Sequence, residues 1–489
     1  MTQFIPYEYQ ELAIEHLRKH DRACLFMGCG LGKTATSLQR MAELIEEGYA
    51  TGFLVVAPLR VCNLTWPAEV EEWEDFSWMK VANLRTDHGW RQLFRGSAHI
   101  YVINYEMLPK LAERYFYNRR QKDYAFQGVY FDELTRAKNH KSTRIKAVRP
   151  YIDKLKWVVG LTGTPAPNSL MELFGQLLLV DKGETFGKHI TRFRQAYFHN
   201  TGYGKFQKWE ATERAEEAVH EKLKKRCITL KTSDWLDLPD IEEEDIEIKL
   251  KPSARRLYEK LQKELIIMLE RGTIEQETLD SIKQQYEEQV DEDFSFDFDG
   301  SHTITAATAA VLTMKLLQAT SGCIYTTEEK KPVVIDDSKM KALEKLCKKY
   351  KGKSPIMIAC WFKHEQERLR SLPGAKLFSD CKKDHEQKRL QDQWNAGKVP
   401  VLVVHPASVG HGINLQKGGH IGAWMTIPWS RELYDQTNAR LHRKGQKNPV
   451  KIYRLLCEDS ADLLVAESLR NKHRQQTNLL NALRKLKSK

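Results

Sequence analysis

Four short apolar runs in the first third of the chain set the expected fold. They cover residues 53–58, 99–104, 128–132 and 157–162. Each ends in a small or polar residue, and amphipathic segments separate them. Continuous apolar runs of this length are typical of strands buried on both faces, and their alternation with helices predicts a parallel sheet. Such sheets bind ligands beyond the carboxyl ends of their strands, so the polar residues after each run are the first candidates for chemistry.

The same pattern returns later in the chain, with strands expected near 355–360, 400–404, 423–427 and 450–456. The fold class is therefore α/β, with two parallel-sheet lobes in tandem and helical insertions. The expected organisation is a first lobe at 1–168, its helical, aromatic-rich insertion at 169–236, an acidic extended linker at 237–250, a helical insertion of the second lobe at 251–336, and the second lobe with a basic helical C-terminus at 337–489.

The composition argues against a membrane-spanning, secreted or zinc-binding protein. The 489 residues contain no run long enough to span a membrane, and the N-terminus lacks a secretory pattern. The nine cysteines are scattered without a Cys-x-x-Cys pair, which indicates reduced cytosolic thiols and no zinc site. We therefore expect a cytosolic protein with no membrane partner.

The charge distribution predicts a polyanionic partner. The formal net charge is +12, and residues 431–489 carry fourteen Lys or Arg against six Asp or Glu. For residues 471–489 a solvated helical tail is as good an interpretation as nucleic-acid contact. Residues 287–299 hold seven acids and three phenylalanines without Lys or Arg. They are either a surface insertion or an acidic decoy for an empty nucleic-acid groove.

A glycine-rich turn near the N-terminus predicts a phosphate cradle. Gly30-Leu31-Gly32-Lys33-Thr34 follows an apolar run, so its backbone N–H groups can face phosphates, the lysine can reach the terminal ones and the hydroxyl can hold Mg²⁺. The strict spacing of such loops requires glycine at position 27, where this chain has Met27.

Four further strand ends carry candidate chemistry. Asp132 and Glu133 suit Mg²⁺ binding and activation of water. Thr162 and Thr164 flank a glycine and can relay the presence of a γ-phosphate to neighbouring loops, with an ordinary Gly-Pro turn as the alternative. The loop 408–415 allows close approach of backbone to a phosphate chain, with an ordinary loop as the alternative. Trp429 follows a strand and either wedges against a base or packs in the core.

Two arginines near the C-terminus complete the pattern. Arg440 and Arg443 are three residues apart, and we expect them on one helix face. Their charge suits a phosphoryl group in transfer. A cradle and a distant arginine pair together predict an ATPase whose site is completed when two lobes meet.

Taken in order, these motifs resemble those of the SWI/SNF-type helicase-like ATPases of helicase superfamily two, over nearly the whole chain. The loop Met27–Thr34 is similar to the family's nucleotide loop, which also lacks the first glycine. The other matching segments are the Tyr7 and Gln10 adenine-sensing segment, Val55–Leu59 with Trp66 and Glu69, Ile103–Glu106, Asp132–Thr135 with Arg136, Lys138 and Asn139, Leu161–Pro165, Ser408–Leu415 and Gln436–Gln446.

The chain departs from the family in two respects. Thr135 stands where the acidic motif usually has histidine, which affects the expected coupling contact but not hydrolysis. The large flanking domains of chromatin remodellers have no counterpart here. The resemblance is therefore to a compact member of prokaryotic or viral type, acting in the prokaryotic cytosol or that of a virus-infected host.

The resemblance implies a DNA-dependent ATPase with two RecA-like lobes and the cofactors ATP and Mg²⁺. Its catalytic residues would be Lys33, Asp132, Glu133, Arg440 and Arg443. ATP would contact Tyr7, Gln10, Gly30, Gly32, Lys33, Thr34, Gly412, Arg440 and Arg443, with Mg²⁺ on Thr34 and Asp132. Nucleic acid would contact Pro58, Arg60, Asn104, Tyr105, Lys138, Asn139, Thr162, Ser408, Gly410, Asn414 and Trp429. Coupling would fall to Thr164, Gln436 and Gln446.

The function implied is a translocase that tracks along double-stranded DNA, as a monomer, without obligatory strand separation. One alternative is a strand-separating helicase or restriction-type motor subunit, with single-stranded or branched DNA as ligand. The other is a DNA clamp that uses ATP only as a switch. Glu133 and both arginines argue against the clamp, because a switch does not need a group that activates water. The sequence names no protein partner.

Overall fold

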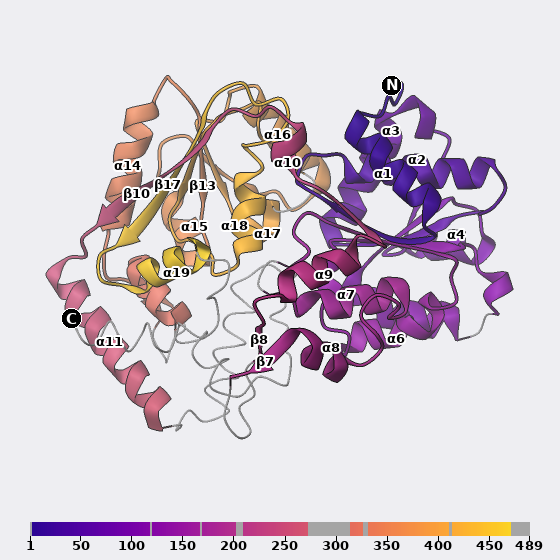
Figure 1. The fold of residues 1–489 in the computed structure, drawn as a ribbon. Helices are drawn as coiled ribbons and strands as arrows, with labels where there is room; N and C mark the ends of the chain where they lie inside the picture. The colour runs from indigo at the N-terminus through magenta and orange to yellow at the C-terminus, as the bar shows by residue number, and fades with distance from the viewer. Residues whose placement is uncertain are drawn as a thin grey trace. The chain divides into compact units, whose positions relative to one another are not determined.

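The computed structural model describes residues 2–117, 120–166, 169–201, 209–271, 313–325, 331–409 and 413–470. The chain divides into two compact units, Met1–Asp237 and Leu238–Lys489, and each has its own sheet and core (Figure 1). The acidic segment 287–299 and the basic tail 471–489 lie outside the described residues. Within the described residues, the helices are all too short or too polar to cross a membrane.

The first unit is built on a seven-stranded sheet in the order β3-β4-β2-β5-β6-β1-β9. Every pairing in it is parallel. Its strands are β1 (Arg22–Met27), β2 (Phe53–Ala57), β3 (Val81–Asn83), β4 (Ile100–Asn104), β5 (Gly128–Asp132), β6 (Trp157–Thr162) and β9 (Cys227–Leu230). The predicted runs at 53–58, 99–104, 128–132 and 157–162 are thus confirmed as buried parallel strands, each within one residue at either end.

Helices cover both faces of this sheet (Figure 1). One layer consists of α1 (Glu8–Lys19), α2 (Lys33–Glu46) and α3 (Trp66–Glu72); the other contains α4 (Asp87–Arg95), α5 (Leu108–Leu111), α6 (Thr143–Ile152), α7 (Glu172–Asp181), α8 (Ile190–Tyr197) and α9 (Ala215–Leu223). The part predicted as a purely helical insertion, 169–236, also holds the hairpin β7 (Phe198–Asn200) and β8 (Trp209–Ala211), α10 (Thr232–Trp235), and the sheet strand β9.

The second unit has a six-stranded parallel sheet in the order β10-β17-β16-β13-β15-β14. Its strands are β10 (Ile241–Ile248), β13 (Ile356–Ala359), β14 (Ala375–Leu377), β15 (Val401–Val404), β16 (Ile421–Trp424) and β17 (Val450–Cys457). The helices are α11 (Pro252–Arg271), α14 (Ser338–Tyr350), α15 (Lys363–Leu369), α16 (Asp384–Asn395), α17 (Pro406–Val409), α18 (Arg431–Asn438) and α19 (Ala461–Arg470), and β11 (Cys323–Tyr325) pairs with β12 (Pro332–Val334). Two tandem parallel-sheet lobes of RecA-like type are therefore present.

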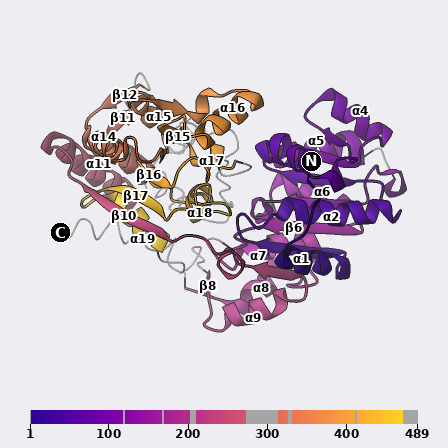
Figure 2. The ribbon, with the colours of Figure 1, turned by 90° about the horizontal axis from the view of Figure 1, so that it is seen from above.

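The predicted acidic linker at 237–250 is wrong in one respect, because residues 241–248 form β10 at the edge of the second sheet. Figure 2 shows β10 running beside β17. The acids are neutralised across the pair: Arg454 lies 2.9 Å from Glu243 and 2.6 Å from Asp245, and Lys451 lies 2.7 Å from Glu244. These contacts join residues about 200 positions apart, so the local sequence shows only the acids.

Candidate active site

The phosphate loop of the first unit is shaped by two left-handed glycines. It connects the end of β1 to Lys33, the first residue of α2. Gly30 has φ 86° and Gly32 has φ 74°, a conformation that side chains disfavour. The loop therefore delivers the free N–H groups of a 14-residue helix to one spot, which is a ready anion site. The Lys33 ammonium donates to the carbonyl oxygen of Met27 at 3.0 Å and so lies across the loop.

Gln10 connects the start of α1 to this loop. Its Oε1 accepts from the Tyr7 N–H at 3.0 Å, and its Nε2 donates to the Leu31 carbonyl at 3.4 Å. A Cβ on Gly32 would lie only 2.4 Å from the same Nε2. The ring of Tyr7 is half exposed and stacks on Tyr9. The structure thus brings the predicted adenine-sensing pair against the predicted phosphate cradle.

The strand-end carboxylates lie at the same edge of the sheet as this loop. Strand β6 pairs with β1 through Thr162 and Phe26 and with β5 through Leu161 and Asp132, so three successive strands end together. Because all three are parallel, their carboxyl ends form one edge. This edge gathers the glycine loop, the Asp-Glu pair and the Thr-Gly-Thr segment, as the sequence predicts.

Asp132 is held in a fixed orientation. Its Oδ2 accepts from the indole Nε1 of Trp66 at 3.1 Å, and its Oδ1 accepts from the Glu133 N–H at 3.1 Å. Glu133 itself has φ 54°, a left-handed value that is uncommon for a residue with a side chain and is typical of functional positions. Trp66 belongs to a matching segment, but its contact with Asp132 joins residues 66 positions apart and has no local signal.

Tyr105, one of the predicted nucleic-acid contacts, points its side chain into the protein. Its side chain is fully buried, and its hydroxyl donates to the carbonyls of Asp132 at 2.9 Å and Glu133 at 3.2 Å. Burial, together with the nearby Asp132, raises the pKa of this phenol well above its usual value, so it stays a neutral donor. Tyr105 therefore braces the backbone of the acidic motif, and its contact with nucleic acid stays a prediction.

The other residues of the first unit that we predict to contact nucleic acid are either buried or partly exposed. Thr162 is fully buried and accepts from the Thr164 N–H at 3.2 Å; Pro58 and Asn104 are also buried, and the contact of all three with nucleic acid stays a prediction. Partly exposed positions are Arg60, Lys138, whose ammonium lies 2.9 Å from Glu172, and Asn139.

Glu106 was missed by the sequence reasoning. Its carboxylate accepts from Asn104 at 2.7 Å and pairs with Arg136 at 3.3 Å and Arg144 at 3.0 Å. It gathers basic side chains from two segments beside the acidic motif. A glutamate two residues beyond a strand end was the only local signal.

In the second unit the two arginines converge, although not on one helix face as predicted. Helix α18 ends at Asn438, where the Asn438 Oδ1 accepts from the buried Trp424 indole at 3.0 Å, and turns follow. Arg440 donates to the Ile413 carbonyl at 3.1 Å, and Arg443 donates to the same carbonyl at 3.4 Å and to the Oδ1 of Asn414. A shared acceptor replaces the helix as the reason for their proximity.

The remaining predicted residues of this unit lie around the arginines. The side chain of Gln446 donates to three carbonyls between 3.0 and 3.1 Å and is buried, so it braces the turn internally. Ser408 is buried and donates to the His405 carbonyl at 2.7 Å, and its contact with DNA stays a prediction. Trp429 is partly exposed and packs on the core, and Gln436 donates to Glu432 at 3.2 Å. Gly410 and Gly412 lie outside the described residues.

Comparisons with known proteins identify the family of this chain. Residues 9–292, more than half of the chain, match the family model of the SNF2-related domain. The chain is 31% identical to "Putative protein p41" of Acyrthosiphon pisum secondary endosymbiont phage 1, over 99% of this chain and all of that one. It is 24% identical to "Uncharacterized ATP-dependent helicase YqhH" of Bacillus subtilis, over 94% of this chain and 77% of that one. A solved structure, the SWI2/SNF2 ATPase core of Sulfolobus solfataricus in complex with dsDNA, is 18% identical with a TM-score of 0.42, covering 98% and 96% of the two chains. The chain belongs to the SNF2-related family of SWI/SNF-type, helicase-like, DNA-dependent ATPases.

Proposed function

We propose that this protein is a motor that uses ATP hydrolysis to track along double-stranded DNA without obligatory separation of the strands. The observation that carries the proposal is the common edge of three neighbouring strands in the first unit, where a left-handed glycine loop meets a fixed Asp-Glu pair. That edge has the parts needed to bind and hydrolyse a nucleoside triphosphate. Family membership supplies the dependence on DNA.

The first unit would bind the nucleotide. The N–H groups at the start of α2 and the Lys33 ammonium would hold the phosphates. Asp132 and Thr34 would hold Mg²⁺, because hydroxyl and carboxylate oxygens are the ligands it prefers and two hydrogen bonds already orient the Asp132 carboxylate. The metal would neutralise charge on the phosphates. Glu133 would take a proton from the attacking water.

Arg440 and Arg443 would complete the site when the two units close on a nucleotide. A pair of guanidinium groups can stabilise the charge on the transferred phosphoryl group. The shared Ile413 carbonyl, with Asn414, supports this role because it sets both side chains in place beforehand. Gln436, Gln446 and Thr164 would couple the nucleotide state to movement, and the three carbonyls that Gln446 holds would link it to the turn that follows the arginines.

DNA would be held mainly through its phosphates. The exposed or partly exposed candidates are Arg60, Lys138, Asn139, Asn414 and Trp429; Gly410 stays a prediction. Contacts of this kind position a protein on DNA without reading sequence, which suits a tracking motor acting as a monomer.

The test compares ATP turnover without nucleic acid and with single-stranded DNA, duplex DNA or RNA. We expect duplex DNA to stimulate most, with an affinity that falls steeply as salt rises. A parallel assay on a short forked duplex measures strand separation. Stimulation by RNA alone, or an affinity insensitive to salt, would overturn the proposal. Efficient unwinding of the fork would favour the strand-separating alternative.

A further inference from the structure

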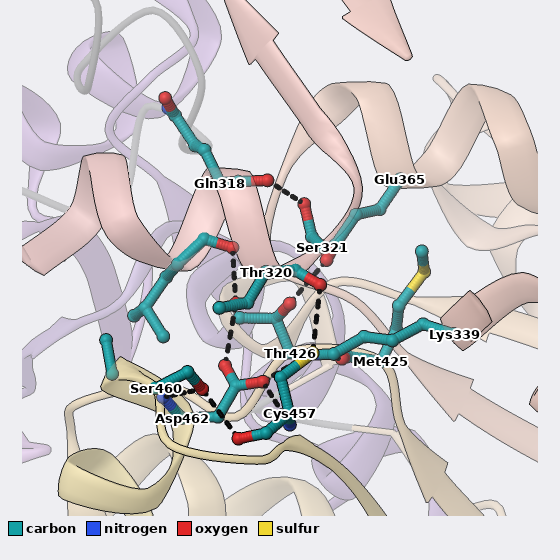
Figure 3. A network of polar contacts seen from close by, with 12 residues as sticks. Gln318, Thr320, Ser321, Lys339, Glu365, Met425, Thr426, Cys457, Ser460 and Asp462 are labelled. Carbon is teal, nitrogen blue, oxygen red and sulfur yellow. Dashed lines mark hydrogen bonds and ion pairs between the residues drawn. The ribbon is translucent and has the colours of Figure 1, made fainter. Parts of the chain in front are cut away.

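A buried polar network lies under the end of strand β16 in the second unit (Figure 3). Residues Met425 and Thr426 follow this strand and are fully buried. The chain then passes through Trp429 to Ser430, which caps α18 by accepting from the Leu433 N–H at 3.3 Å. Arg440 and Arg443 follow directly after α18. The path of this stretch therefore sets where α18 begins, and both arginines come after that helix.

Lys339 of α14 holds the first of these two residues. Its ammonium donates to the Met425 carbonyl at 2.9 Å and lies 2.8 Å from the Asp462 carboxylate of α19. The side chains of both charged residues are almost completely buried. Burial disfavours the charge on Lys339, but Asp462 with its neighbours outweighs burial and raises the pKa of the ammonium.

Glu365 of α15 holds Thr426, the second of these two residues. One carboxylate oxygen accepts from the Thr426 hydroxyl at 2.5 Å. The other accepts from the N–H groups of Trp361 at 2.6 Å and Phe362 at 3.0 Å. The side chain is fully buried, and burial raises the pKa of its carboxyl. Lys339 and Glu365 thus hold the successive residues Met425 and Thr426 from two different helices (Figure 3).

The network also reaches the helical residues 313–320. Asp462 accepts from the Thr320 hydroxyl at 2.9 Å and from the Cys457 N–H at 2.9 Å. Next to it, the Ser321 hydroxyl lies 2.6 Å from the ring nitrogen Nε2 of His364. Buried charges are costly compared with apolar side chains of the same volume, so stability alone is a weak reason for such an arrangement. Fixed geometry at residues 425 and 426 is the stronger one.

We propose that Lys339 and Glu365 are positioning residues for ATP hydrolysis. By holding the Met425 carbonyl and the Thr426 hydroxyl, they fix the path from β16 into α18 and so the aim of Arg440 and Arg443. This inference rests on the roles proposed above for the two arginines. A misplacement of about 1 Å at a reacting group can cost on the order of 10²-fold in rate. Nucleotide binding to the first unit does not depend on this path.

The first experiment compares two substitutions of Thr426. Thr426→Val keeps the side-chain shape and removes the hydroxyl, whereas Thr426→Ser keeps the hydroxyl. In the valine variant we expect duplex-stimulated kcat to fall at least tenfold with the KM for ATP nearly unchanged. In the serine variant kcat should stay within about twofold of wild type. A loss of melting temperature in Thr426→Val with full kcat would overturn the proposal, because it would show a purely structural role.

The second experiment separates stability from position at Lys339. Lys339→Met alone leaves Asp462 buried without its cation and is expected to fold poorly. The double variant Lys339→Met/Asp462→Asn removes both charges at nearly constant volume. We expect its melting temperature to recover most of the loss while kcat stays at least tenfold low, since the Met425 carbonyl is still unheld. Recovery of kcat in step with melting temperature would contradict the positioning role.

Arg443→Ala, measured in parallel, tells the two proposals apart. If this variant keeps full turnover, the role proposed for the arginines is wrong and the positioning inference falls with it. If it loses turnover while Thr426→Val and the Lys339/Asp462 double variant keep it, the arginine role stands and only the positioning inference is overturned. Loss of kcat in all three variants, with serine rescue at 426, supports both.

Discussion

Replacing Gly32 by alanine tests the link between the phosphate loop and Gln10. Gly32 has φ 74°, so a side chain there costs about 1 kcal/mol in backbone strain. The new Cβ would also lie 2.4 Å from Gln10 Nε2. Gln10 must then rotate away and give up its bonds to Leu31 and Tyr7, each worth about 0.5–1.5 kcal/mol. The 3.4 Å bond to Leu31 belongs at the low end of that range.

The expected total is about 2 kcal/mol, which corresponds to roughly thirtyfold in an equilibrium constant. Because the cost falls on the conformation that binds phosphate, we expect the Kd for a fluorescent ATP analogue to rise by about that factor. Gly48→Ala is the matched control: it lies just past the other end of α2, has φ 75°, and a Cβ there meets nothing within 4 Å. It should carry the strain of about 1 kcal/mol without a change in nucleotide affinity.

A second experiment separates the steric clash with Gln10 from the backbone strain at Gly32. In a Gln10→Ala background the side chain that collides is absent, so the further effect of Gly32→Ala should shrink to the strain alone. The two effects would then be clearly non-additive, as expected for residues in contact. Equal nucleotide affinities in Gly32→Ala and Gly48→Ala, or full additivity with Gln10→Ala, would refute the reasoning.

Three further predictions concern hydrolysis and pH. Glu133→Gln should keep nucleotide affinity in a binding titration but lose hydrolysis, whereas Lys33→Ala should weaken both; near wild-type turnover in Glu133→Gln would remove this residue from the mechanism. Arg443→Ala should leave nucleotide affinity nearly intact and lower duplex-stimulated turnover by a factor on the order of 10³–10⁵. Arg443→Lys should restore little of this turnover, because lysine lacks the planar fork of arginine. An affinity loss equal to that of Lys33→Ala would contradict closure of the two units. Burial, with a contribution from Arg368, lowers the pKa of His364 to about 3, below the value of about 6.5 in the unfolded chain. The unfolded chain then binds more protons, so stability from this residue is present above pH 6.5 and is lost as pH falls towards 3, by about 3 kcal/mol at pH 4.5. His364→Gln should flatten that part of a melting curve series against pH, and an unchanged slope would show that His364 is not the group responsible.

The sequence predicted the strands well because apolar runs such as 128–132 leave few alternatives: a fully buried strand needs apolar side chains on both faces. Strand β10 escaped the same reasoning because its partners are Lys451 and Arg454 of a distant strand. Acids along a strand look like a solvated connector until the cations opposite them are known. Register across a sheet is a non-local property that no window of sequence contains.

In the candidate site too, the sequence predicted local features but not contacts between distant segments. The motifs predicted that the loop and the carboxylates follow buried strands, as they do, because their spacing reflects local backbone requirements. They did not show which way a side chain points. Tyr105 stands in a matching segment, yet it turns inward to brace the Asp132 carbonyl. Arg440 and Arg443 meet through Ile413, which lies on another loop, and not through helical spacing.

The negative charge of β10 also opposes aggregation of this protein through the edge of its second sheet. β10 occupies the edge of its sheet and carries five acids in eight residues, whereas β17 behind it is almost entirely buried. An open edge strand offers its backbone to another chain and invites aggregation, and like charges along it oppose such pairing. A fragment that begins after residue 250 would lack this guard and expose the apolar edge of β17. Preparations of the second unit should therefore begin before β10 if they are to stay dispersed.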